Sequence, residues 1–240
     1  MPEPISGSRY SHGMPDMKPL TLEALKANAA AFVQRMNGVE IPKLYGTTDG
    51  KAVGTYVEHD FHEWLLTRYT YASGNSASGI DFPDLKVDLK VTSVKQPQSS
   101  CPFSSASQKV YGLGYHLLVF VYDKRDDAKN QTAQLEFLHG VFVHSSATAD
   151  FQTTTGLNEI LRRDGNLDDV IAFLEERNLP LDEIACKDLA ERILREPPGP
   201  GYLTMSNALQ WRLQYGRVLT LAAAAETLGV EDLLHSGGNA

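Results

Sequence analysis

Between residues 85 and 90 the chain reads Leu-Lys-Val-Asp-Leu-Lys, a strict alternation of apolar and charged side chains. In an extended chain the three apolar side chains share one face and the three charged ones share the other. This period of two predicts a half-buried β-strand, which must find partners in a sheet. Asp88 and Lys90 are then neighbours on the polar face of that strand.

A second run, residues 115–122, is almost continuously apolar and predicts a central strand covered on both faces. Another strand is expected over residues 135–144. Apolar periodicity and capping residues predict a helix within residues 51–71. They also predict helices over residues 21–36, 105–112, 157–163, 167–177, 184–195, 208–221 and 222–234. Strands among helices predict an α/β fold with a central mixed sheet flanked by helices.

The 240 residues are enough for a sizeable core in one or two domains. We expect a flexible N-terminal arm rich in Pro, Gly and Ser over residues 1–19. An α/β core is expected over residues 20–155, and a helical C-terminal part over residues 156–240. No apolar run is long enough to span a membrane and no secretory signal is visible, so a cytoplasmic protein is expected. The two cysteines lack zinc or redox spacing.

The net charge of −8 argues against a polyanionic partner. Two windows, residues 89–122 and 197–225, nevertheless contain no acidic residue, although both contain Lys or Arg. They are candidates for surfaces that meet a polyanion. The alternative is that the first window is buried strand and the second an apolar helix.

Asp81 lies upstream of the alternating strand, behind a Phe-Pro-Asp sequence that predicts a turn. If the chain reverses there, the carboxylates of Asp81 and Asp88 converge, and the backbone carbonyl of Leu89 adds a third oxygen. Hard oxygen ligands of this kind suit magnesium. Such an ion generates a nucleophilic water and neutralises charge on a phosphate, while Lys90 can orient the water. The alternative is a surface strand whose charges are merely solvated.

The stretch from Gly79 to Lys90 resembles the active-site motif of the PD-(D/E)xK nuclease superfamily, in the branch of type II restriction endonucleases and the mismatch-repair nicking endonuclease. The resemblance implies a restriction-endonuclease-like core, with Asp81 and Asp88 as metal ligands and Lys90 as the catalytic lysine. Mg2+ is the implied cofactor, with Mn2+ as a substitute. A Glu on the preceding helix is implied too. Glu58 matches, in Gly-Thr-Tyr-Val-Glu, and Glu63 is its competitor.

Side chains that can contact double-stranded DNA occur in three segments. The resemblance implies a role for the pair that follows the lysine strand, Gln108 and Lys109. The helix expected over residues 208–221 carries Asn, Gln and Arg, which make bidentate contacts to bases; packing in the core is the alternative. The candidates on the polar loop are Lys95, Gln96, Gln98, Ser99 and Ser100, and those near the helix are Asn207, Gln210, Arg212, Gln214 and Arg217.

We therefore expect a type II restriction endonuclease that hydrolyses double-stranded DNA at a specific short sequence. A homodimer follows if the target is palindromic. A cognate DNA methyltransferase is expected as a functional companion. Two alternatives stay open: a repair or nicking nuclease of the same superfamily, and a DNA-binding module that does not cut.

Overall fold

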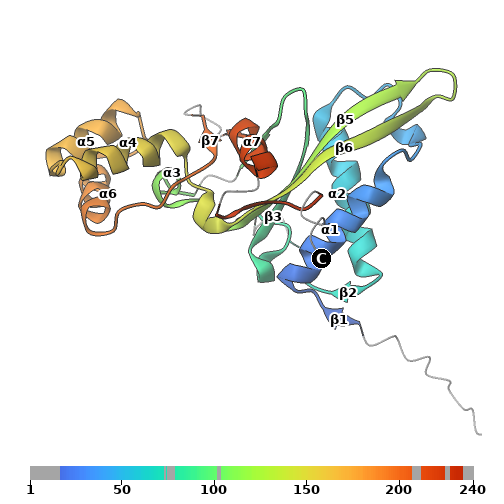
Figure 1. Ribbon diagram of the computed structural model, residues 1–240, viewed down its shortest axis with the longest axis horizontal. Coiled ribbons are helices and arrows are strands. Elements are labelled where there is room, and N and C mark those ends of the chain that lie inside the picture. The colour runs from blue at the N-terminus through green and yellow to red at the C-terminus, as the bar shows by residue number, and fades with distance from the viewer. Residues whose placement is uncertain are drawn as a thin grey trace, which may run out of the picture.

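The central element of the fold is a four-stranded mixed sheet with the strand order β3-β5-β6-β9 (Figure 1). A computed structural model describes residues 17–72, 74, 79–101, 104–206, 212–224 and 228–234. In it β3 (Val87–Ser93) runs parallel to β5 (His116–Asp127), and β5 is antiparallel to β6 (Thr132–Val143). The sheet ends at β9 (Val230–Asp232), which is antiparallel to β6. The predicted mixed sheet is confirmed.

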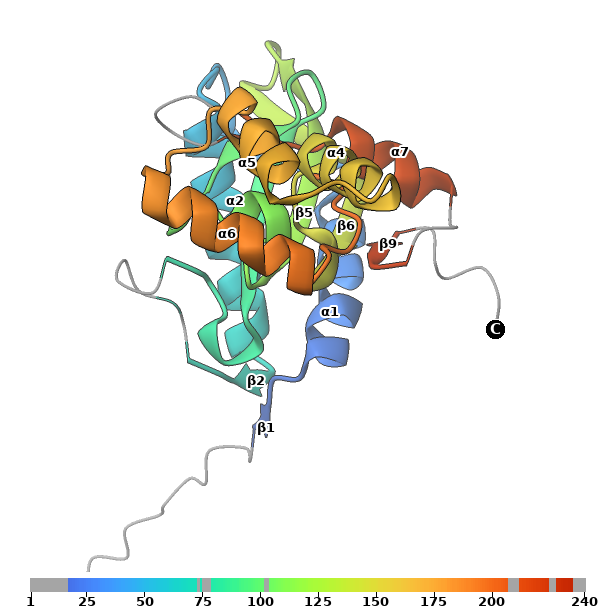
Figure 2. The same cartoon turned by 90° about the vertical axis from the view of Figure 1, so that its left-hand side faces the viewer.

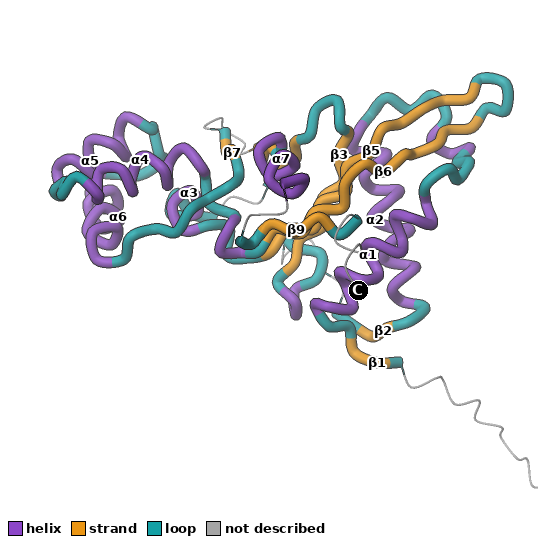
Figure 3. The backbone as a smooth tube through the Cα atoms, viewed as in Figure 1, coloured by secondary structure: helices purple, strands orange, loops and turns teal. Residues whose placement is uncertain are grey.

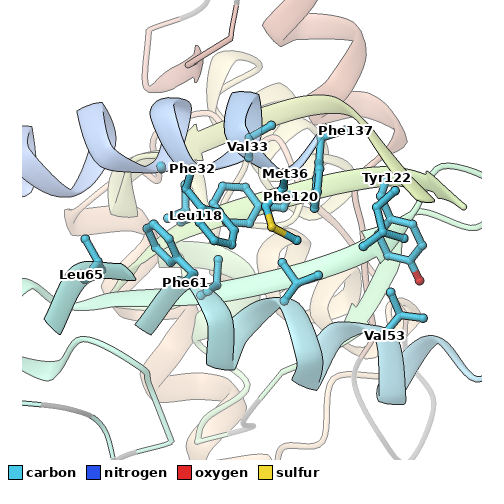
Figure 4. Close-up of a cluster of buried hydrophobic side chains, with 14 of the residues drawn as sticks. Phe32, Val33, Met36, Val53, Phe61, Leu65, Leu118, Phe120, Tyr122 and Phe137 are labelled. Atoms are coloured by element: carbon cyan, nitrogen blue, oxygen red, sulfur yellow. The ribbon is translucent and has the colours of Figure 1, made fainter. Parts of the chain in front are cut away.

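Two long helices, α1 (Leu22–Met36) and α2 (Gly50–Leu66), cover one face of this sheet. Alternate side chains of β5, among them Phe120, point into this layer. The rings of Phe32 and Phe61 have centroids 5.0 Å apart, and that of Phe120 is 5.4 Å from Phe61 (Figure 4). This aromatic cluster fixes α2 against the sheet, which matters because α2 carries a candidate site residue.

The opposite face of the sheet packs against helix α7 (Gly216–Ala224) and a small three-stranded sheet (Figure 3). The small sheet has the order β4-β8-β7. Its strands are β4 (Gln98–Ser100), β7 (Thr204–Met205) and β8 (Arg212–Gln214). The central strand β5 is therefore covered on both faces, as its apolar run predicted.

A helical lobe extends from one end of the core, and the β5–β6 hairpin extends from the other (Figure 1). Figure 2 shows the lobe from its own end, with its helices in front of the core. The lobe contains α4 (Phe151–Arg162), α5 (Leu167–Glu176) and α6 (Glu183–Arg195), which share a hydrophobic cluster with α3 (Gln108–Tyr111). Side chains at the helix N-termini accept backbone hydrogen bonds, and Asn166 with Asp169 forms a capping box. The helices that apolar periodicity predicted between residues 157 and 195 are confirmed, although α4 begins earlier than expected.

The remaining elements are short. They are β1 (Lys18–Pro19), β2 (Tyr69–Thr70), and the 3-10 turns η1 (Pro42–Leu44), η2 (Pro83–Leu85) and η3 (Ser145–Ala147). Residues 1–16 of the expected N-terminal arm lie outside the described residues, while β1 pairs with β2. Within the described ranges, none of the helices combines the length and apolar character that crossing a bilayer would require.

Three sequence expectations were wrong in detail. The helix expected over residues 208–221 is replaced by β8, and α7 begins only at Gly216; residues 207–211 lie outside the description. Leu213 and Tyr215 are buried and their neighbours are exposed, which is the period of a strand. The helix expected over residues 222–234 gives way to β9, which follows Gly229 at φ 88°. Strand β3 begins at Val87 rather than two residues earlier.

Candidate active site

The chain reverses before β3, as the Phe-Pro-Asp sequence predicted. Phe82 and Val87 form an isolated antiparallel bridge, with N–O distances of 2.9 and 3.1 Å in the two directions. The 3-10 turn η2 lies between them. Lys86 closes the turn in the left-handed region, with φ 51° and ψ 47°. This tight reversal brings Asp81 beside the strand that carries Asp88.

Asp81 is tied to β3 by its side chain. Its Oδ2 accepts a hydrogen bond from the backbone N–H of Leu89 at 2.8 Å. Within a β-strand the N–H and C=O of one residue point to the same side. The carbonyl of Leu89 therefore points to the side of the strand where Asp81 lies, away from β5. The same edge of β3 faces α2, because the Val91 carbonyl lies 3.7 Å from an ideal Cβ on Gly54.

A pocket of about 310 Å³ gathers the predicted acids and lysine. Asp88, which lines it, is only 1% exposed. Lys90 Nζ lies 2.9 Å from Asp88 Oδ2, so the two groups form an ion pair. The full lining consists of Glu58, Gly74, Gly79, Ile80, Asp81, Asp88, Leu89 and Lys90.

Gly74, one of the small residues before the strand, packs closely against the backbone of residues 80 and 81. Gly74 N–H donates to the Asp81 carbonyl at 2.8 Å. A Cβ at position 74 would lie 1.9 Å from the Ile80 carbonyl oxygen. A side chain at position 74 would therefore displace this residue from Asp81 and disturb the pocket that it lines.

The pocket perturbs the ionisation of its own groups. Burial raises the pKa of Asp88 to about 7, and the adjacent Asp81 adds to the rise, although Lys90 opposes it. Burial also raises the pKa of Glu58, with a further contribution from the charge of Asp81. Burial alone would lower the pKa of Lys90, but the carboxylates, Asp88 foremost, hold it above its usual value. A site with excess buried negative charge gains from a bound cation.

The donor set fits a magnesium ion. Asp88 Oδ2 is buried, and the described group that neutralises it is the Lys90 ammonium at 2.9 Å. Magnesium is usually held by one or two carboxylates and keeps several waters. Asp81, Asp88 and the Leu89 carbonyl offer such a set, with Glu58 on the wall of the same pocket. The described residues contain no group of three His, Cys, Asp or Glu side chains already gathered for a metal.

The competing candidates lie elsewhere. Glu63 does not line the pocket; its side chain is 64% exposed and lies 3.6 Å from His59. Asp84 is exposed in the turn η2. His62 Nδ1 is 2.8 Å from the Tyr71 hydroxyl, and its ring stacks on Phe82. The geometry thus favours Glu58 over Glu63 and Asp81 over Asp84.

A second hollow of about 660 Å³ lies beside the pocket and takes in half of the candidate DNA-contact residues. From here on it is called the cleft. Its lining includes Lys95, Gln96, Gln98, Ser99, Ser100 and Arg212, all of which the sequence suggested. Sequence reasoning missed Thr47, Thr48, Lys51 and Lys124, which also line it. Of these, Lys51 could have been identified from the sequence as a candidate, because it lies at the start of the helix that carries Glu58.

The two acid-free windows of the sequence meet at the cleft. Strand β4 from the first window pairs antiparallel with β8 from the second, with Gln98 opposite Gln214 and Ser100 opposite Arg212. The described charged residues that line the cleft are Lys51, Lys95, Lys124, Asp126 and Arg212. Positive charge therefore predominates there in a protein whose net charge is negative.

Four other candidate DNA-contact residues do not line the cleft. Lys109 is 3% exposed and its Nζ donates to the Met205 carbonyl at 3.1 Å. Gln108 is also buried, and its amide bonds the backbone of residues 104, 105 and 113. Gln214 is exposed on β8, and the Arg217 guanidinium lies 3.5 Å from the Phe151 ring centroid. Asn207 and Gln210 lie outside the described residues.

An α/β fold that gathers three acids and a lysine in one pocket, next to a cationic cleft, has the architecture of an endodeoxyribonuclease. The comparisons with known proteins agree. The family model of the type II restriction enzyme NspV matches residues 19–232, so the chain belongs to that family. It is 59% identical over 203 residues to the type II restriction enzyme NspV of Nostoc sp. (strain ATCC 29411 / PCC 7524), an alignment that covers 85% of this chain and 92% of the relative. No solved structure matches the chain.

Proposed function

We propose that this type II restriction endonuclease cuts double-stranded DNA at a specific short sequence in a magnesium-dependent reaction. In this proposal Asp81, Asp88, Glu58 and the backbone carbonyl of Leu89 hold the ion, and Lys90 acts on the water and the phosphate. The observation that carries the proposal is the pocket itself, which gathers these groups around a buried carboxylate oxygen. Membership of a restriction enzyme family supports DNA as the substrate.

Each residue has a distinct task. A bound magnesium ion supplies Lewis acidity and a water with a lowered pKa. Asp88 and Asp81 set the position of the cation relative to β3. Lys90 stays protonated because its carboxylate neighbours raise its pKa. Its ammonium can then offset negative charge on the scissile phosphate and hold the attacking water.

The test is cleavage of supercoiled plasmid by purified protein with Mg2+, with Mn2+ and with EDTA. Discrete linear fragments are expected with either metal and intact plasmid with EDTA. Sequencing the ends gives the target and the overhang. Nicked circles alone would favour the alternative of a nicking nuclease.

The variants Asp88→Ala and Lys90→Ala test the residue roles. Both should lose cutting while the circular dichroism spectrum stays unchanged. Undiminished cleavage by both variants would refute the assignment of the pocket. Binding without cleavage by the wild-type protein on addition of Mg2+ would favour a module that keeps the fold without cutting.

A homodimer follows if the sequenced target is palindromic, because two pockets must meet two strands related by a two-fold axis. Light scattering of the protein on its cognate duplex should then give the mass of two chains. A cognate DNA methyltransferase is the companion that such an enzyme requires. A monomer on a palindromic duplex would contradict the dimer.

A further inference from the structure

The cleft and the catalytic pocket lie along one seam between α2 and β3. On β3 the pocket takes residues 88–90 and the cleft takes residues 91–93. On α2 the pocket takes Glu58, and the cleft takes Gly50, Lys51 and Val53. A duplex that places a phosphate at the pocket therefore passes the cleft next.

The far wall of the cleft is a β-ribbon, by which we mean the paired strands β4 and β8. Alternation along the pair places Gln98, Ser100, Arg212 and Gln214 on one side, and Ser99 and Leu213 on the other. Leu213 is fully buried, whereas Arg212 and Gln214 are exposed. The polar row therefore points out of the protein.

The β-ribbon is held rigidly. The Ser99 hydroxyl is 2.6 Å from the hydroxyl of the buried Tyr215, whose N–H donates to the Pro97 carbonyl at 2.9 Å. On the β3 side, Thr92 Oγ1 accepts from the N–H of Gln98 at 3.1 Å and donates to its carbonyl at 3.0 Å. Thr92 thus fixes the β-ribbon to the strand that carries Asp88 and Lys90. Rigid support of this kind lowers the entropic cost of recognition.

The chemistry of the polar row is that of base recognition. The major groove of B-DNA admits a two-stranded β-ribbon, and there Arg pairs with guanine while Gln pairs with adenine. Arg212 is exposed, and within the described part of the chain it has no ion pair. A surface that only bound phosphates would need cations, whereas this row carries two amides and a hydroxyl beside its one arginine.

We infer that the β-ribbon of β4 and β8 is the element that selects the DNA sequence, with Arg212 directed at a guanine and Gln98 and Gln214 at adenines in the major groove. The inference rests on the proposed DNA cleavage and names the surface that gives it specificity. From Asp88 to Ser93 the strand rises about 17 Å at about 3.3 Å per residue. At 3.4 Å per base pair, the bases read should lie within about five base pairs of the cut.

The test compares cleavage rates on the cognate duplex with those on duplexes that carry one substituted base pair. The wild-type target comes from sequencing the cleaved ends. For Arg212→Ala, the preference at one G·C position should fall by about 5- to 150-fold, the worth of one bidentate contact, while preferences elsewhere are kept. Gln98→Ala and Gln214→Ala should each relax one A·T position. Where a variant cuts slowly, the same ratios are measured as binding in EDTA.

Arg212→Lys separates base reading from charge. It keeps the cation but loses the planar fork, so it should relax the same G·C position as Arg212→Ala. If Arg212 bound only phosphate, Lys would restore wild-type preference, and Arg212→Ala would weaken all duplexes equally with a salt slope smaller by about one. That result would overturn the inference.

Two exposed residues outside the cleft give matched controls, Arg162→Ala in the helical lobe and Gln134→Ala on β6. Both should keep wild-type preferences at every position. Wild-type protein that cuts no DNA would refute the proposed function itself. Wild-type protein that cuts one sequence, with unchanged preferences in all the β-ribbon variants, would refute only the β-ribbon assignment.

Discussion

The carboxylate of Asp81 accepts a hydrogen bond from the backbone amide of Leu89, with 2.8 Å between Oδ2 and N. This bond ties the residue before the turn η2 to strand β3, which follows the turn. It also orients the Leu89 carbonyl toward the pocket, because the backbone N–H and C=O of Leu89 lie on the same side of the strand. Asp81 is therefore both a structural acceptor and a proposed ligand.

The two roles of Asp81 can be separated by substitution. Asp81→Asn keeps an acceptor for Leu89 and should retain wild-type stability within about 1 kcal/mol, whereas Asp81→Ala should lose about 1–3 kcal/mol. Both should reduce magnesium-dependent cleavage more than about a hundredfold, because a bound metal is worth several kcal/mol in the transition state. Urea unfolding and plasmid cleavage measure the two effects. Equal stability of the two variants would contradict the structural role.

The pKa of Asp88 gives the metal-free protein a defined pH dependence. Burial raises this pKa to about 7, above about 3.9 for an unfolded chain. The folded state then binds the extra proton between these values, so the stabilisation is complete below about pH 4 and is lost as the pH rises toward 7. The difference in unfolding free energy between wild type and Asp88→Asn in EDTA should therefore fall over this range and level off above it.

Magnesium binding should show the opposite trend. The ion needs the ionised carboxylate, so its affinity should rise as the pH passes through 7, and binding should release a proton. Calorimetry in buffers of different ionisation enthalpy measures the proton count. A pH-independent affinity between pH 6 and 8 would show that Asp88 is not a ligand.

Glu58 and Glu63 provide a matched pair on one helix. Glu58→Gln should slow cleavage by about a hundredfold or more, because it removes the charge of one of the proposed ligands of the ion. Glu63→Gln should cut within about twofold of wild type, because Glu63 is exposed and outside the pocket. The measurement is the single-turnover rate at saturating Mg2+. A loss in Glu63→Gln and none in Glu58→Gln would reverse the assignment.

Lys109 and Lys95 form a second pair. Lys109→Met should lower the free energy of unfolding by about 1–3 kcal/mol, because it leaves the buried Met205 carbonyl without its donor. The folded variant should bind DNA as the wild type does. Lys95→Met should keep the free energy of unfolding of the wild type but bind DNA more weakly, because the Lys95 side chain is 77% exposed at the cleft. Thermal melts and filter binding at two salt concentrations separate the outcomes.

The pocket could be predicted from sequence because its signals are local. Asp81, the turn and Asp88 lie within one short stretch, so alternation and a turn sequence suffice to bring them together. The left-handed Lys86, which delays the start of β3, was not visible, because lysine seldom adopts that conformation. The strands of the core followed from their apolar runs for the same reason.

The β-ribbon could not be predicted in this way. Gln98 and Gln214 are partners across more than a hundred residues, and no local pattern fixes such a pairing. Residues 212–215 alternate between exposed and buried, which is the period of a strand. In the sequence this short alternation was hidden, because side chains on both sides of it are spaced as in a helix. Lys109 shows the same limit, because its burial depends on the distant backbone of Met205.

The hydrogen bonds of Thr92 have a consequence for engineering the enzyme. Its hydroxyl joins the backbone of Gln98 to β3, the strand that carries the proposed catalytic residues Asp88 and Lys90. A redesign of the target sequence that shifts β4 will also move the Asp88–Lys90 pair relative to the scissile bond. New specificities obtained by remodelling this backbone should thus come with slower turnover, whereas side-chain exchanges on an undisturbed backbone should spare it.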